Sequence, residues 1–274
     1  MPLYLHILGI HIHVTSDIGD TPLALLRQNY SQLTRDSFDE HSTNTLHYQI
    51  KAAEHLFAIL CTPDNQRIEC EKPSQFIYFF EKNLTIQLQK QHSHLLFLHA
   101  ATLTHQQQAF LIIGQSGAGK STTTWALTHH GFGYSSDELS PIDLEQMTVA
   151  PYPHAICLKR PPPAPYTLPN ATLKTDYTMH IPVDYLSSGV NHQPVPVKHI
   201  FFVQYDVNQE NVLIEPISAA NATMQIYTNA LNQLCHSDAG LPAASKLAQH
   251  CDNYILRFSD VYQACLQIRK LVSA

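Results

Sequence analysis

The stretch Phe110–Leu139 decides the fold and reads FLIIGQSGAGKSTTTWALTHHGFGYSSDEL. Its first part fits G-x-x-x-x-G-K-[ST] between an apolar strand predicted over 109–113 and a helix predicted over 121–130. Such a glycine-rich turn points backbone N–H groups at a phosphate, and the helix N-terminus adds its positive end. The residues predicted to bind a nucleotide are Gly114, Gln115, Ser116, Gly117, Ala118, Gly119, Lys120, Ser121 and Thr122.

Two side chains of this loop have separate expected tasks. Lys120 is expected to reach the β- and γ-phosphates, and the Ser121 hydroxyl is expected to bind Mg²⁺. A chance match on a glycine-rich turn is the alternative, but the flanking strand and helix favour a nucleotide site. No base-reading motif is recognisable, so the sequence leaves the choice between ATP and GTP open.

An acidic pair follows the loop closely, because Asp137 comes 17 residues after Lys120. A helix of about ten residues returns the chain by roughly 15 Å, and a strand over 132–136 is expected to run parallel beside the first. A right-handed crossover then brings Asp137 and Glu138 to the sheet edge that carries the loop. One carboxylate would hold the metal ion while the other orients or deprotonates an acceptor hydroxyl. The alternative is a solvated acidic turn.

A histidine is expected beside the same loop. Strands predicted over 95–104 and 109–113 flank a four-residue turn, 105–108, of hairpin length. In a symmetric hairpin, facing positions have numbers that sum to 213, which sets His99 opposite Gly114. The alternative for His99 is a core histidine satisfied by backbone groups.

Two cations end a strand predicted over 152–160. Cations are sparse in this part of the chain, so Lys159 or Arg160 would stabilise charge on a transferred phosphoryl group. A solvated strand end is the alternative. Trp125, inside the predicted helix, is expected in the core rather than stacked on a base.

The remaining chain predicts a smaller, mostly β N-terminal lobe over 1–93 and a nucleotide-binding domain over 94–274. The segment 160–196 holds eight prolines, which exclude a long helix or a central strand. It is either a partly disordered surface loop or a lid that docks a substrate. The elements predicted in the N-terminal lobe are strands over 4–15, 46–50, 55–60, 76–80 and 84–88, with a turn at 82–83, and a helix over 21–33.

Composition narrows the function classes. The chain has 274 residues, 44% of them hydrophobic, and a net charge of −6, so it offers no basic field for nucleic acid or an anionic membrane. The N-terminus lacks the pattern of a secretory signal, and no apolar run reaches membrane-span length. A cytoplasmic protein is therefore expected. The histidine pairs 11/13 and 92/94 lack a third zinc ligand placed by spacing.

These motifs resemble the HPr kinase/phosphorylase-like ATPases, which share their core with phosphoenolpyruvate carboxykinase. The resemblance covers about 94–160 and rests on Leu98-His-Ala-Ala-Thr102, the phosphate loop and Gly131-Phe-Gly-Tyr-Ser-Ser-Asp-Glu138. It implies an α/β fold with a P-loop kinase core, a mixed sheet flanked by helices. It also implies that His99 lies near the transferred phosphate, that Asp137 is the general base and that Glu138 helps to bind metal.

The two ends of the chain are similar to a subgroup of HPr-kinase-related proteins, through Gly9–Ser16 and Tyr254–Phe258. Some of its members phosphorylate a serine of a ribosomally made precursor peptide, such as a lasso peptide precursor. The subgroup resemblance also supports Lys159 at its strand end, and the family implies self-association. The segment that marks the phosphorylase reaction of true HPr kinases is not found.

The resemblance therefore implies an ATP- and Mg²⁺-dependent serine kinase acting on a peptide or small protein. Two alternatives stay open at this point. A small-metabolite kinase of the carboxykinase superfamily would keep the fold and change the acceptor. A nucleotide-dependent peptide-binding protein would keep the phosphate loop and leave the acidic pair idle.

Overall fold

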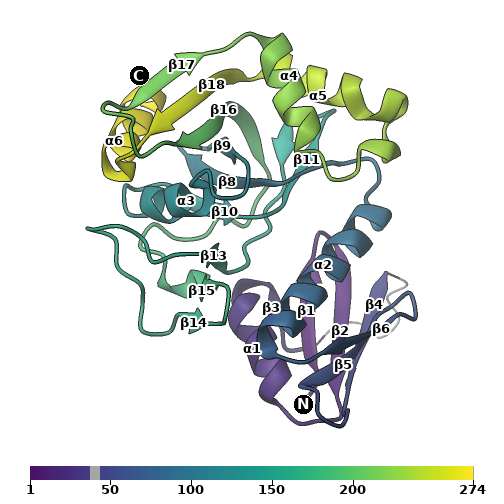
Figure 1. The fold of residues 1–274 in the computed structure, drawn as a ribbon. Coiled ribbons are helices and arrows are strands. Elements are labelled where there is room, and N and C mark those ends of the chain that lie inside the picture. The colour runs from purple at the N-terminus through teal and green to yellow at the C-terminus, as the bar shows by residue number, and fades with distance from the viewer. Residues whose placement is uncertain (38–43, 274) are drawn as a thin grey trace.

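The computed structural model describes residues 1–37 and 44–273, which form a mixed α/β protein with three β-sheets (Figure 1). The N-terminal sheet has the strand order β3-β1-β2-β4-β5-β6. Buried side chains alternate with more exposed ones along β1, β2 and β4, so one face of this sheet packs inward. Its strands are β1 (Leu3–Ile7), β2 (Ile10–Ser16), β3 (Thr34–Arg35), β4 (Thr45–Lys51), β5 (Ala58–Cys61) and β6 (Arg67–Cys70).

The single strand predicted over 4–15 is instead the hairpin β1–β2. Its turn is made by Leu8 and Gly9, whose φ angles of +51° and +77° are the left-handed values that a two-residue hairpin turn uses. Leucine is not a residue that signals such a turn, and the apolar alternation continues on both sides of it. The strand predicted over 46–50 is confirmed as β4, whereas the one predicted from 55 begins only at Ala58.

The N-terminal sheet packs against two helices, α1 (Thr21–Asn29) and α2 (Pro73–Gln91). The strands predicted over 76–80 and 84–88 are wrong, since both segments lie within α2. The predicted turn at 82–83 is helical too, because Asn83 is buried and its Oδ1 accepts a 2.8 Å hydrogen bond from the Tyr48 hydroxyl. The helix buries every fourth residue, which is helical spacing: Phe76, Phe80, Leu84 and Leu88. The helix predicted over 21–33 ends at Asn29, and the 3₁₀ turn η1 (Ser31–Leu33) follows.

The second sheet follows the path β10-β8-β9-β16-β12-β11-β7, and β18 pairs with both β16 and β17. The predicted hairpin register is confirmed, since Thr104 faces Ala109 and Ala100 faces Ile113. The strand predicted over 95–104 is interrupted at His99, because β7 pairs with β11 while β8 pairs with β9. The strands are β7 (Leu96–Leu98), β8 (Ala100–His105), β9 (Gln108–Ile113), β10 (Gly133–Ser136), β11 (Ser140–Asp143), β12 (Thr148–Val149), β16 (Val195–Tyr205), β17 (Leu213–Pro216) and β18 (Asp252–Phe258).

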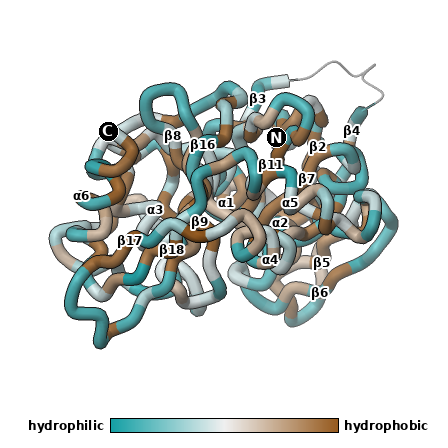
Figure 2. The backbone as a smooth tube through the Cα atoms, turned by 90° about the horizontal axis from the view of Figure 1, so that it is seen from above, coloured by the Kyte–Doolittle hydropathy of each residue, from teal (hydrophilic) through white to brown (hydrophobic). Residues whose placement is uncertain are grey.

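Helices cover both faces of this sheet. On β9, Phe110 and Ile112 pack in one core with α3 (Lys120–Thr128) and α6 (Val261–Val272). Leu111 and Ile113, which point to the opposite face, pack in a second core with α4 (Ala219–Thr228) and α5 (Leu241–His250). Figure 2 shows the hydrophobic residues along the strands of the interior and hydrophilic ones on outer turns. Two 3₁₀ turns, η3 (Gln233–Cys235) and η4 (Ser237–Gly240), join α4 to α5. Every helix in 1–37 and 44–273 is too short or too polar to cross a bilayer.

Strand β10 lies one strand further from β9 in the sheet than expected. It was predicted to run parallel beside β9, but it pairs antiparallel with β8, which lies between them. The β8–β9 hairpin already occupies that side of β9, and parallel β16 occupies the other. Because β8 is antiparallel to both neighbours, β10 still points the same way as β9. Asp137 therefore emerges at the sheet edge that carries the loop.

The proline-rich segment 160–196 packs against the rest of the protein. It contributes β14 (Leu173–Lys174), β15 (Met179–Ile181) and the 3₁₀ turn η2 (Val183–Tyr185), and the two strands form a small sheet with β13 (Ile156–Leu158). Tyr166, Ile181 and Leu186 are buried in the same core as α3. The prolines exclude long elements, as expected, yet the segment is anchored and lies beside α1 in Figure 1.

The N-terminal elements share a core with residues beyond the predicted boundary at 93. Leu95, Phe97, Leu139 and Tyr152 all belong to the cluster that includes Phe80 of α2. Leu139 directly follows the acidic pair, so the N-terminal elements pack against the chain next to those carboxylates.

The helical assignment of α2 is testable by two substitutions. In a strand, Phe80 and Tyr78 would share a face, whereas in the helix Phe80 is fully buried and Tyr78 is 58% exposed. We expect Phe80→Ala to lower the free energy of unfolding by about 3–5 kcal/mol and Tyr78→Ala to change it by about 0.5 kcal/mol or less. Denaturant unfolding measures both, and equal losses would contradict the helix.

Candidate active site

The loop between β9 and α3 is built on three glycines. Gly117 and Gly119 have φ angles of +88° and +95°, which residues with side chains disfavour. A Cβ on Gly114 would lie 2.8 Å from Val203 Cγ2, and one on Gly119 would lie 3.2 Å from the Phe258 ring. Backbone conformation and close packing therefore require glycine here.

Helix α3 starts directly after the loop. Among the described residues, no side chain caps its first turn. The first N–H groups of such a helix bind anions readily, because they lack intrahelical partners and lie at the positive end of the dipole. Ser121 and Thr122 lie in this turn. Within the loop, the Ala118 N–H donates a 3.0 Å hydrogen bond to the Gln115 carbonyl.

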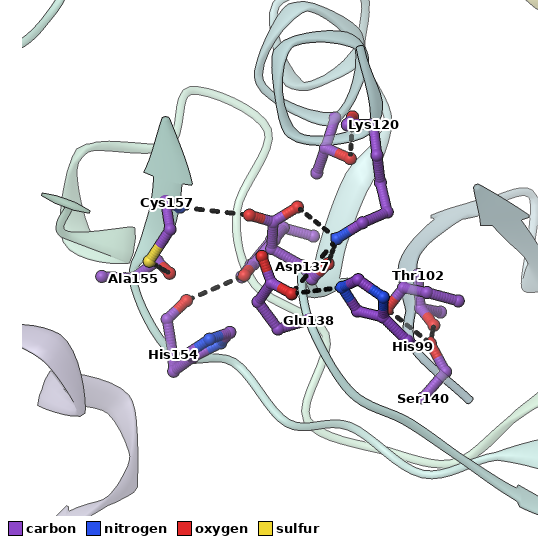
Figure 3. A network of polar contacts seen from close by, with 12 residues as sticks. His99, Thr102, Lys120, Asp137, Glu138, Ser140, His154, Ala155 and Cys157 are labelled. Atoms are coloured by element: carbon purple, nitrogen blue, oxygen red, sulfur yellow. Dashed lines mark hydrogen bonds and ion pairs between the residues drawn. The ribbon is translucent and has the colours of Figure 1, made fainter. Parts of the chain in front are cut away.

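The ammonium group of Lys120 joins the loop to the acidic pair (Figure 3). Lys120 is buried, and its Nζ donates a 2.7 Å hydrogen bond to the backbone oxygen of Asp137. The same Nζ lies 3.4 Å from Glu138 Oε2 and 4.0 Å from Asp137 Oδ1. The acidic pair thus lies beside the loop, as the sequence predicted, and the contact of Lys120 with both residues is an addition from the structure.

Asp137 is fully buried at the end of β10. Its Oδ2 accepts a 3.1 Å hydrogen bond from the Cys157 N–H, while Oδ1 makes no hydrogen bond within the described residues. Burial raises the pKa of Asp137 above its ordinary value, and the charge of Lys120 offsets only part of that rise. A carboxylate with a raised pKa and one unused oxygen is suited to accept a proton.

The pKa of Glu138 is shifted in the opposite direction to that of Asp137. Burial raises its pKa, but a hydrogen bond from His99 and the charge of Lys120 outweigh it, so the pKa lies below the ordinary value. His99 Nε2 lies 2.7 Å from Glu138 Oε2. Two adjacent carboxyl groups whose pKa values are pushed apart take different roles. Here the raised pKa of Asp137 favours proton uptake, whereas the lowered pKa of Glu138 keeps that side chain ionised.

Lys159 also reaches the loop. It follows β13, and its Nζ donates a 2.6 Å hydrogen bond to Ser116 Oγ. Lys159 and Arg160 are both exposed, and Lys159 is the one whose hydrogen bond reaches the predicted phosphate site. Trp125, on α3, is buried in the core, as predicted.

A cavity of about 540 Å³ borders the loop on the side of β16 and α4. Its lining combines the backbone of the loop with uncharged side chains of β16 and α4. The residues that line it are Ile113–Ala118, Phe202–Tyr205, Gln225, Thr228 and Asn229.

Three groups of this site had no signal in the sequence. The Cys157 N–H that holds Asp137 is a backbone group, which residue identity does not reveal. His154 and Glu81, which meet at 2.8 Å, come from segments far apart in the chain. Only the tertiary structure brings them to the acidic pair.

No protein-family model matches the sequence, and no curated protein matches it either. Among solved structures, the chain is similar to the HPr(Ser) kinase/phosphatase from Coxiella burnetii, with 15% sequence identity and a TM-score of 0.32. The match covers 65% of this chain and 93% of that one. The function therefore has to be argued from the site itself.

The oxygen donors at the site fit Mg²⁺. Hydroxyl and carboxylate oxygens are its preferred protein ligands, and Ser121, Asp137 and Glu138 supply them. Oδ1 of Asp137 makes no hydrogen bond within the described residues, so the acidic pair is open to a further contact. Within 1–37 and 44–273, no group of three or more His, Cys, Asp or Glu side chains is arranged to hold a metal ion. A magnesium ion here would also need oxygens from its substrate and water.

Asp137→Asn tests the buried charge. Because the folded-state pKa of Asp137 is raised, its ionisation destabilises the fold, and stability is lost as pH rises from the ordinary pKa through the raised one. We expect Asp137→Asn to raise Tm at pH 7–8 in metal-free buffer, and the gain to shrink toward pH 4. Thermal unfolding across this range measures it. A variant less stable than the wild type at pH 7–8 would show that Lys120 outweighs burial.

Proposed function

We propose that this protein is an ATP- and Mg²⁺-dependent serine kinase that transfers a γ-phosphoryl group to a peptide or small protein. In this proposal residues 94–274 form a P-loop kinase core of the HPr kinase/phosphoenolpyruvate carboxykinase type. Residues 1–93 form a smaller lobe packed against it.

One observation carries the proposal. Lys120, at the start of the helix that follows the glycine loop, is within 2.7–4.0 Å of both residues of the acidic pair. A lysine so placed can contact a phosphate in the loop and keep it next to the two carboxylates. Asp137 would be idle in a protein that only bound nucleotide, yet it is buried at a cost to stability.

Each residue of the site has its own role in the proposed reaction. Backbone N–H groups of the loop, Lys120 and Lys159 hold the phosphates and balance their charge. Asp137 accepts the proton of the serine hydroxyl at Oδ1, while the Cys157 N–H keeps Oδ2 in place. The serine oxygen forms its bond to phosphorus as the bond to the leaving nucleoside diphosphate breaks. Mg²⁺, when bound, further neutralises the charge of the phosphates.

His99 and Glu138 act as a pair in this scheme. The hydrogen bond from His99 keeps Glu138 ionised and oriented toward Lys120. Glu138 is then available to the metal without competing for the proton that Asp137 takes.

The segment 160–196 is the proposed contact for the acceptor. It directly follows Lys159, and it presents Tyr177 and Tyr185 to solvent, 72% and 56% exposed. Exposed aromatic rings offer contact area for a peptide chain.

The test is transfer of labelled γ-phosphate from Mg·ATP into an extract of the native host, followed by mass spectrometry. We expect a peptide or protein labelled on serine by the wild type. Asp137→Asn should lower the rate about 10²–10⁴-fold, because general-base catalysis is lost, while nucleotide binding persists.

Asp143→Asn is the matched control for this experiment. Asp143 lies on β11 and accepts hydrogen bonds from the N–H groups of Glu145 and Gln146, which asparagine can also accept. It should transfer phosphate at the wild-type rate. Full activity of folded Asp137→Asn would disprove the general-base role, and label found only in a small metabolite would change the acceptor class.

A further inference from the structure

The segment 152–157, which ends in Cys157, lies between the N-terminal helices and the acidic pair. The Tyr152 N–H donates to the Ser135 carbonyl of β10 at 2.9 Å, and the Ala155 N–H donates to the Asn29 carbonyl of α1 at 2.8 Å. Its last residue, Cys157, donates the N–H that holds Asp137 Oδ2. Both lobes therefore fix the peptide that positions the proposed base.

His154 lies in the middle of this segment and is 2% exposed. Its Nε2 lies 2.8 Å from Oε1 of Glu81, a partly buried carboxylate on α2. Its carbonyl accepts a 2.8 Å hydrogen bond from the Tyr134 hydroxyl of β10. In Figure 3, His154 and Cys157 lie on the opposite side of the acidic pair from His99.

The pKa shift of His154 agrees with its position between Glu81 and the acidic pair. Burial lowers the pKa of His154, but Glu81, Asp137 and Glu138 outweigh burial and raise it overall. His154 is buried and Glu81 is partly buried, so leaving either charge unpaired is costly and their 2.8 Å contact favours this arrangement of both side chains.

We infer that Glu81 is a positioning residue for Asp137. Through His154, the Glu81 carboxylate fixes the segment 152–157, so that the Cys157 N–H holds Asp137 Oδ2 and leaves Oδ1 facing the acceptor hydroxyl. The inference rests on the proposed function for its catalytic consequence. It makes α2, in the N-terminal lobe, a part of the active site.

Glu81→Gln tests this contact, since it removes the charge and keeps the shape. We expect kcat for phosphotransfer to fall by about 10- to 100-fold, the usual effect of losing a partner that orients an active-site group. The KM for nucleotide should stay within about twofold, because the phosphate loop is untouched. Glu81→Asp, which keeps the charge, should recover part of kcat and serves as the second variant.

Two controls separate positioning from general stability. Lys82→Gln changes the exposed neighbour on α2 and should leave kcat unchanged. The double variant Glu81→Gln/His154→Gln should be no slower than His154→Gln alone, because the two residues act in sequence. Additive losses would contradict action through His154.

Amide hydrogen exchange gives a readout that does not depend on activity. Glu81→Gln should speed exchange of the Cys157 N–H at least about tenfold and leave Ile112 of β9 unchanged. If the wild type transfers no phosphate, the proposed function fails, and this exchange still decides the positioning role. Folded Glu81→Gln with wild-type exchange at Cys157 overturns the inference.

Discussion

The buried ammonium of Lys120 is the constraint on which the site depends. It lies between the backbone oxygen of Asp137 and the carboxylate of Glu138, in a region where an unpaired charge would be strongly destabilising. Two elements have to meet for this contact, the start of α3 and the end of β10. The interruption between β7 and β8 adds His99, which bonds to Glu138. The strand order β10-β8-β9 achieves this, because β10 and β9 point in the same direction on either side of β8.

The two carboxylates owe their difference to their neighbours. Glu138 has a histidine and a lysine within 3.4 Å, whereas Asp137 is fully buried with one backbone N–H as its hydrogen-bond donor among the described residues. Glu138 therefore stays ionised, and Asp137 has a proton affinity suited to a base. Leu139 packs into the N-terminal core directly after them, so residues of that core help to hold the pair.

The sequence predicts the local parts of this site well. The glycine loop, its lysine and the acidic pair are close in the chain, and the register of the β8–β9 hairpin follows from the length of its turn. Contacts between residues far apart in the chain, and the type of some elements, are harder to predict from the sequence. The four-residue spacing of α2 was hidden by short apolar runs and by Asn83, which resembles a turn residue but bonds to Tyr48. The contact between Glu81 and His154 and the amide of Cys157 depend on tertiary packing, which a single sequence does not encode locally.

The account is tested most directly by calorimetric titration of Mg·ATP into the wild type and into Lys120→Met. It predicts saturable binding of one nucleotide per chain to the wild type, and loss of that binding in a Lys120→Met variant shown to be folded by circular dichroism. No binding to the wild type at millimolar Mg·ATP, or equal binding to both proteins, would contradict the assignment of the loop and Lys120 as a phosphate site.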